Sequence, residues 1–393
     1  MQEFNYTENM ENRMFEIWGD DDDVNIDKVL DYLNRPEVFR DFGEGLQELI
    51  VNKYGEVDVV QFILNKAKDK EIVFNRNTVK NWIDGNRPKK GEQSREHMFK
   101  LAFTLELDFE EIDILFRKIY LDKPFNLRDR NEFIYYYCLK EGHSYKHAQM
   151  LIEELLSDET SKCEETMVTR MIEKDLILLK DDVAVIDYIK KHPHNFQINT
   201  VSAKRTLEAL LNEVRACEED KKKLEEKRVD KTCSYTIREY DVFRSLENEE
   251  VLLDKNKDIS SISSMLMIIE GGDIVRTRRE QGGNVLKNAK LPQEIKNRFP
   301  TKHTFTNDNP TFEELRKMII LLFSYKMWFE KQYEEEELEL EDYIARMDDL
   351  LYDSGLQTMY YGNPFDWLFL YCTITDNPLD SFREIMWESI WDK

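Results

Sequence analysis

The sequence predicts an all-α protein, and two observations support this class. Apolar residues recur at intervals of three and four along most of the chain, as they do on one face of a helix. Residue types that cap helices, such as Asp129 and Thr311, stand directly before several of these stretches. The architecture is therefore expected to be mostly or wholly helical.

The composition indicates a compact protein of the cytoplasm. Apolar residues make up 41% of the chain, too many for a disordered protein, and the low counts of 13 Gly and 9 Pro argue against a collagenous one. No apolar run approaches the roughly 18 residues of a membrane helix, and the acidic N-terminus lacks a signal-peptide pattern. Five scattered cysteines without a CxxC pair favour reduced thiols. We expect no membrane partner.

The charge is segregated along the chain. Asp and Glu number 80 against 56 Lys and Arg, a formal net charge of −24, which argues against a generic nucleic-acid coat because phosphate binding needs cations. Residues 1–41 and 331–353 each carry a net −8, whereas residues 75–100 carry +4 and residues 274–302 carry +6. Binding to nucleic acid should therefore depend on a few placed side chains.

Composition and periodicity divide the chain into five segments. The first is acidic and reads as a flexible arm with a short helix near residues 26–33. A compact helical domain follows, and a basic, loop-rich connection separates two further helical regions. The segments are the arm (1–41), the compact domain (42–123), the middle region (124–273), the connection (274–310) and the C-terminal region (311–393).

The compact domain begins with two short amphipathic helices. Leu46, Leu49 and Ile50 share one face of the first, and the second covers residues 57–64. A polar turn over residues 66–74 then leads into the next helix.

The segment NRNTVKNWIDGNRPKK, residues 75–90, is the most informative part of the chain. Asn75 is placed to cap a helix whose Val79, Trp82 and Ile83 face inward. Gly85 is placed where the end of that helix needs a positive φ. The side chains around the outer face suit DNA, because Asn and Arg can read base edges and Lys can contact phosphates. The candidate DNA-binding residues are Arg76, Asn77, Thr78, Lys80, Asn81, Arg87, Lys89 and Lys90.

The order of these helices resembles the lambda-repressor/Cro-type helix-turn-helix family. TVKNWIDGNR looks like the family's recognition-helix ending, and KLAFTLELDFEEIDILF, residues 100–116, looks like its next helices. The turn predicted at residues 66–74 is longer than the family's usual turn of about three residues. The resemblance implies a DNA-binding domain that acts as a dimer on a palindromic operator. The residues that carry it are Thr78, Val79, Trp82, Gly85 and Arg87.

The function implied by the resemblance is a sequence-specific transcriptional regulator, with a helical C-terminal region for oligomerisation or sensing. The competing hypothesis is a protein-interaction or stress and defence module that uses the helix-turn-helix fold without operator binding. Its C-terminal region would then contact a protein partner. A third alternative is RNA binding through residues 274–302, although that stretch lacks the Walker spacing and reads as a surface loop.

The middle region begins as a helical hairpin. Asp129 can cap its first helix, Gly142 can end it and Ser144 can cap the second. Farther along, helix is favoured, but the β-branched and aromatic residues 235–237 are also compatible with a strand.

The C-terminal region reads as packed helices. Thr311 begins a long helix with a capping-box spacing to Glu314. Aromatic residues are concentrated in the tail, residues 356–393, so we expect the tail to be packed rather than frayed.

Candidates for catalysis or metal binding are few. His143 and His147 stand at i and i+4 with Cys138 nearby, but no acid completes an HExxH pattern, and we interpret them as exposed or capping histidines. The acidic run at residues 334–342 reads as a solvated helix face. No nucleophile-elbow, kinase or deaminase motif occurs. We expect no enzyme activity, no cofactor and no metal ion.

Overall fold

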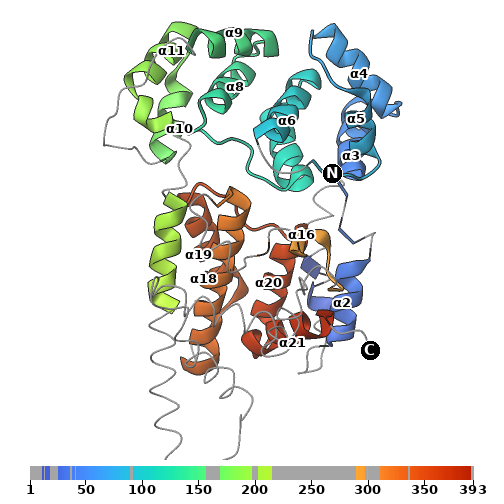
Figure 1. Cartoon of the computed structure of the whole chain (residues 1–393), viewed down its shortest axis with the longest axis vertical. Coiled ribbons are helices and arrows are strands. Elements are labelled where there is room, and N and C mark those ends of the chain that lie inside the picture. The colour runs from blue at the N-terminus through green and yellow to red at the C-terminus, as the bar shows by residue number, and fades with distance from the viewer. Residues whose placement is uncertain are drawn as a thin grey trace, which may run out of the picture. The chain divides into compact units, whose positions relative to one another are not determined.

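The computed structural model describes a helical protein (Figure 1). No strand occurs in the described part of the chain, so the all-α prediction is confirmed there. Among the same residues, no helix is both long enough and apolar enough to cross a membrane. The structure describes residues 11–12, 14–17, 25–35, 38–39, 41–88, 92–155, 169–196, 202–214, 289–296, 299, 310–334 and 337–390.

The chain divides into two compact units. The first, here called the α3–α11 unit, comprises residues 40–202 and 355–357. The second, the α18–α21 unit, comprises residues 1–39, 203–354 and 358–393.

Side-chain caps that the sequence supplies begin the helices of the α3–α11 unit. Asp41 and Glu44 form a capping box at the start of α3, Asp58 caps α4, and Asp129 caps α8 as predicted. The elements are α3 (Phe42–Tyr54), α4 (Val59–Asp69), α5 (Arg76–Ile83), α6 (Glu92–Thr104), α7 (Phe109–Asp113), the π-helix η1 (Ile114–Tyr120), α8 (Arg130–Lys140), α9 (Tyr145–Leu155), α10 (Thr169–Leu178), α11 (Asp182–Lys191) and the 3-10 helix η2 (Pro193–Phe196).

A continuous hydrophobic core joins these elements from α3 to η2. The ring of Phe99 in α6 lies 4.9 Å from that of Phe116 in η1 and 5.0 Å from that of Tyr135 in α8, between centroids. Phe133 of α8 in turn contacts Phe196 of η2 at 5.0 Å. We expected the compact domain to end at residue 123, but the shared core places α8 to α11 in the same unit.

Helices α3 and α5 meet at a glycine. A Cβ atom at Gly43 would lie 2.4 Å from the carbonyl oxygen of Ile83 and 2.7 Å from that of Trp82, which is well inside van der Waals contact. Glycine at this position therefore lets α3 pack directly against the C-terminal end of α5.

The C-terminal part of the chain supplies most of the α18–α21 unit. The capping box predicted at its start is confirmed, because Thr311 N–H donates to Glu314 Oε2 (2.7 Å) and Glu314 N–H donates to Thr311 Oγ1 (3.3 Å). The elements are α2 (Ile26–Asn34), a helical stretch at residues 202–214, α16 (Gln293–Lys296), α18 (Phe312–Glu334), α19 (Leu340–Asp353), α20 (Pro364–Ile374) and α21 (Pro378–Ile390).

The aromatic tail is packed, as predicted. Phe365, Trp367 and Phe369 of α20 are fully buried. Helix α20 is also tied to α18 by an ion pair, in which Arg316 donates to both carboxylate oxygens of the buried Asp366 at 2.7 and 2.6 Å. A bidentate pair of this kind fixes the two helices in register.

Helix α2 packs into the α18–α21 unit, whereas we expected its residues to belong to a flexible arm. Val29 and Leu33 are buried, and the ring centroid of Tyr32 lies 4.9 Å from that of Trp367. The side-chain amide of Asn34 donates to the carbonyl oxygen of Lys290 (2.8 Å). The apolar face of this short helix is sufficient to dock it despite its acidic surroundings.

Several predictions fall outside the described residues. They concern Lys89, Lys90, the alternative strand at residues 235–237 and most of the basic stretch 274–302. Within that stretch α16 is described, and Lys296 Nζ donates to the carbonyl oxygen of Ala289 (3.2 Å).

Candidate nucleic-acid interface

The turn between α4 and α5 is shorter than we predicted. We expected a turn over residues 66–74, but α4 continues to Asp69. The added turn of helix is stabilised by the buried Ala67, whose carbonyl oxygen accepts from Ile72 N–H (2.8 Å). Glu71 has a φ of 59°, the left-handed conformation that ends many helices. The sequence prediction missed this turn of helix because Ala67, its buried residue, stands between two lysines.

Helix α5 is held by a cap and by its apolar face, as predicted. The side chain of Asn75 accepts from Asn77 N–H (2.8 Å). Val79 and Trp82 are buried. The Trp82 ring lies edge-on to Phe74, with centroids 5.9 Å apart, and contacts further rings of α3 and α6. These contacts fix how α5 is turned about its own axis.

One of the rings against Trp82 is that of His97, at a centroid distance of 5.6 Å. Burial and the charge of Lys100 lower the pKa of His97. The imidazole is therefore neutral at pH 7, which suits its place beside an indole.

The end of α5 also follows the sequence prediction. Gly85 has a φ of 90°, and its N–H donates to the carbonyl oxygen of Trp82 (3.1 Å). Asn86 N–H donates to the carbonyl oxygen of Asn81 (3.0 Å). These two hydrogen bonds satisfy carbonyl groups at the C-terminal end of α5 and end the helix after about two turns.

Four of the predicted DNA-binding residues lie together on the exposed face of α5. Arg76, Asn77, Lys80 and Asn81 are all exposed. Thr78, between them in sequence, is half-buried. We call the four exposed residues the α5 face.

The remaining predicted DNA-binding residues either lie outside α5 or fall outside the described residues. Arg87 follows the Gly85 turn and is half-buried, with its Nε atom inside the protein. Lys89 and Lys90 lie outside the described residues.

Two cations that contribute to the net charge of residues 75–100 serve the fold instead. Arg95 is largely buried and forms ion pairs with Glu132 (Nε to Oε1, 2.6 Å) and Asp122 (2.9 Å). Lys100 pairs with Glu96 one helical turn away (2.9 Å). The positive charge available to a ligand is therefore smaller than the sequence count, and the described cations of the α5 face are Arg76 and Lys80.

Lysines in and directly after the last turn of α4 likewise form ion pairs within the unit. Lys66 and Lys70 both pair with Glu106, at 3.4 and 2.5 Å. The hydrogen bond from Lys70 is the main cause that lowers the pKa of Glu106. Lys68, between the two, is exposed.

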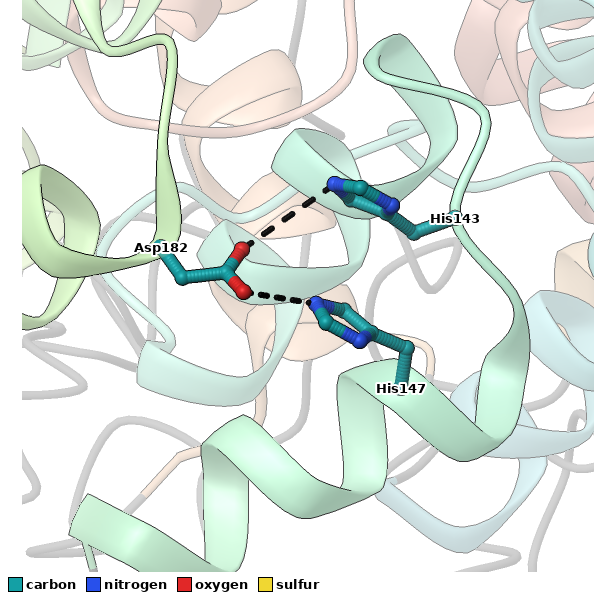
Figure 2. Close-up of side chains that lie close together, drawn as sticks. All are labelled: His143, His147 and Asp182. Carbon is teal, nitrogen blue, oxygen red and sulfur yellow. Dashed lines mark ion pairs between the residues drawn. The ribbon is translucent and has the colours of Figure 1, made fainter.

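A second group of titratable side chains lies in the part of the unit that runs from α8 to α11. Figure 2 shows His143 and His147 converging on Asp182, with His147 Nε2 at 3.0 Å and His143 Nε2 at 4.0 Å from its carboxylate oxygens. The two histidines stand at i and i+4 in the sequence, but α9 begins at Tyr145, so His143 lies in the turn before the helix and only His147 lies on it. The sequence indicated no acid near them, because Asp182 comes from α11.

The surroundings of Asp182 favour its charged form. Burial works to raise its pKa, but the close contact of His147, the hydrogen bond from Tyr137 and the charges of the histidines outweigh burial, so its pKa lies below the ordinary value. Burial is the main cause, and the charge of Asp182 a further one, that raises the pKa of the Cys138 thiol to about 12. Cys138 is therefore a neutral, inert core residue.

Comparison of the chain with models of protein families, with curated proteins and with solved structures finds no significant match.

Proposed function

We propose that the protein binds DNA with the α5 face and acts as a sequence-selective transcriptional regulator. One observation carries the proposal. Arg76, Asn77, Lys80 and Asn81 are exposed together on a helix whose opposite side is anchored by Trp82. In the described part of the chain, no acidic side chain pairs with Arg76 or Lys80.

The chemistry of the α5 face suits base edges. Arg76 and Lys80 are one helical turn apart, and so are Asn77 and Asn81, which gives two adjacent rows. Arginine can donate two hydrogen bonds to guanine, and asparagine can pair with both edge groups of adenine. Arginine and asparagine can therefore recognise the base sequence, whereas lysines mainly contact phosphates and fix the position of the protein on the DNA backbone.

The size of α5 fits a major groove. With its side chains an α-helix is about 10–12 Å across, close to the major-groove width of about 12 Å, and the 8 residues of α5 give it about two turns to lie along the groove. Helix α5 packs on α3 and α4, and the exposed Lys68 near the end of α4 is suited to a flanking phosphate.

The charge of the chain favours selective over general binding. With a net charge of −24, the long-range electrostatic interaction of the whole chain with DNA is repulsive. Affinity must then come from short-range contacts of a few side chains, which is the condition for sequence preference. By the helix-turn-helix resemblance, we further propose a dimer that presents two α5 helices to half-sites about 34 Å apart.

Replacing both Arg76 and Asn81 by alanine is expected to abolish sequence preference. Each lost base contact should reduce discrimination by about 1–3 kcal/mol, or roughly 5- to 150-fold. Duplexes bound by the full chain are first selected from a random pool. The dissociation constants for a selected and a scrambled duplex are then measured by fluorescence anisotropy in the wild type and the variant.

Lys174→Ala is the matched control. It removes the same positive charge from an exposed position on α10, so it should leave the preference for the selected duplex unchanged. If no duplex is enriched, or if the double variant discriminates as well as the wild type, the proposal is wrong.

A protein-interaction function is the second candidate, and the side chain of Val73 favours it. Val73 lies in the turn before α5 and is 83% exposed. Covering an apolar side chain so exposed would favour binding of a partner, because it removes apolar surface from water. If a stoichiometric protein partner copurifies, survives nuclease treatment and is lost with Val73→Ser, this second function is favoured over DNA binding.

A further inference from the structure

We propose that His143, His147 and Asp182 bind one divalent transition-metal ion, such as zinc. Their potential ligand atoms all lie within 4.8 Å of one another, and Figure 2 shows the two imidazoles and the carboxylate pointing to a common centre. The site belongs to the α8–α9 turn, α9 and α11, away from α5 in sequence and independent of the DNA-binding proposal.

Local backbone features bring the two histidines together. Gly142 has a φ of 72° and ends α8, which turns the chain back at His143. Ser144 Oγ then caps α9 by accepting from His147 N–H (3.2 Å). His143 and His147 are thus held on either side of a helix cap, with ring centroids 4.4 Å apart.

A cap also places the carboxylate. The side chain of Asp181 accepts from Ala184 N–H (2.8 Å) and begins α11, which leaves Asp182 at the first helical position. Its side chain is free of capping and turns toward the α8–α9 hairpin. The phenol of the buried Tyr137 donates to Asp182 Oδ1 (2.9 Å).

The distances match a small coordination sphere. Zinc bonds of about 2.0–2.2 Å in tetrahedral geometry place ligand atoms roughly 3.3 Å apart. The distances from Asp182 are 3.0 Å to His147 Nε2 and 4.0 Å to His143 Nε2. The three ligand atoms, all within 4.8 Å of one another, need to draw closer by side-chain rotation to surround one ion.

The ligand types select the class of metal. Two imidazoles and one carboxylate suit zinc and its neighbours in the first transition row, whereas calcium and magnesium prefer oxygen ligands alone. Three protein ligands leave a position for water or another small ligand. The hydrogen bond from Tyr137 to Asp182 is the outer-shell contact that orients such a carboxylate.

A bound ion would also join parts of the fold that are distant in sequence. It would fasten the α8–α9 turn to the start of α11 across the core that these helices share. Because the three ligands converge only in the folded unit, binding should stabilise that unit by mass action.

Cobalt(II) is the most direct probe, because its visible spectrum reports coordination. The full chain, reduced and stripped of metal, is expected to bind one equivalent of cobalt with visible absorption that zinc abolishes. His147→Ala and Asp182→Asn should lose that absorption. His192→Ala, at the C-cap of α11, should keep the cobalt absorption.

Tyr137→Phe separates metal binding from a purely structural role. The variant keeps the ring in the core but removes the hydroxyl, so it should fold and yet bind cobalt about 10- to 100-fold more weakly. His143→Ala, in a turn, offers a second variant that removes a ligand without disturbing a helix. Cobalt binding that is absent in the wild type, equal in the wild type and His147→Ala, or marked by a thiolate charge-transfer band would overturn the proposal.

Discussion

Arg95→Met is expected to destabilise the α3–α11 unit by about 3–5 kcal/mol, because it leaves the buried carboxylate of Glu132 without its charged partner. Arg95 donates to Glu132 at 2.6 and 2.7 Å and to Asp122 at 2.9 Å. It also donates to the carbonyl oxygens of Lys123 and Pro124. This single side chain therefore joins α6, the segment after η1 and the first turn of α8.

The electrostatics of the site agree with this role. Burial alone would lower the pKa of Arg95, but the charges of Glu132 and Asp122 raise it above the ordinary value. Glu132 also accepts from Asn126 N–H (2.6 Å). Without the arginine its carboxylate would keep this bond but lose its positively charged partner.

Hydrogen exchange of the α6 and α8 amides measures the effect, because it reports the stability of this unit separately. Arg95→Met combined with Glu132→Gln should recover a large part of the loss, since it removes the uncompensated charge. If Arg95→Met lowers the free energy of unfolding by less than about 1 kcal/mol, the Arg95–Glu132 pair contributes no more than an exposed, solvent-screened ion pair. That result would contradict the structural role assigned to Arg95.

Trp82→Ala is expected to destabilise the same unit by about 3–5 kcal/mol, the usual cost of removing a buried tryptophan. Trp82 is 4% exposed and contacts the rings of Phe42, Phe74 and His97. It is the main apolar anchor of α5, together with Val79. The loss should therefore be concentrated in α5 and its neighbours.

Trp82→Phe serves as the control, because it keeps an aromatic side chain in the same pocket and should lose less than half as much stability. Both variants are compared by hydrogen exchange of the α3, α5 and α6 amides. Unchanged protection of α5 in Trp82→Ala would show that this residue does not hold the α5 face in place.

Structural features that depend on a few consecutive residues could be predicted from the sequence. The caps at Asn75, Asp129 and Thr311 and the turn at Gly85 depend on one residue and its near neighbours, and the structure confirms them. The burial of Val79 and Trp82 followed from helical spacing in the same way.

Contacts between residues distant in sequence could not be predicted. Arg95 was counted as a free cation because Glu132 stands 37 residues away. Asp182 was missed because a carboxylate on α11 gives no sign that it will face His147. The packing of α2 was likewise hidden, since its partner Trp367 lies in the tail of the chain.

Mapping the residues that crosslink to DNA tests the central claim most directly. The full chain is bound to a duplex selected from a random pool, irradiated with ultraviolet light, and the crosslinked peptides are identified by mass spectrometry. We predict crosslinks in the peptide that contains α5, Arg76–Ile83, and their loss in the Arg76→Ala/Asn81→Ala variant. Crosslinks confined to residues 274–302, or none above the level of a scrambled duplex, would contradict the assignment of DNA binding to the α5 face.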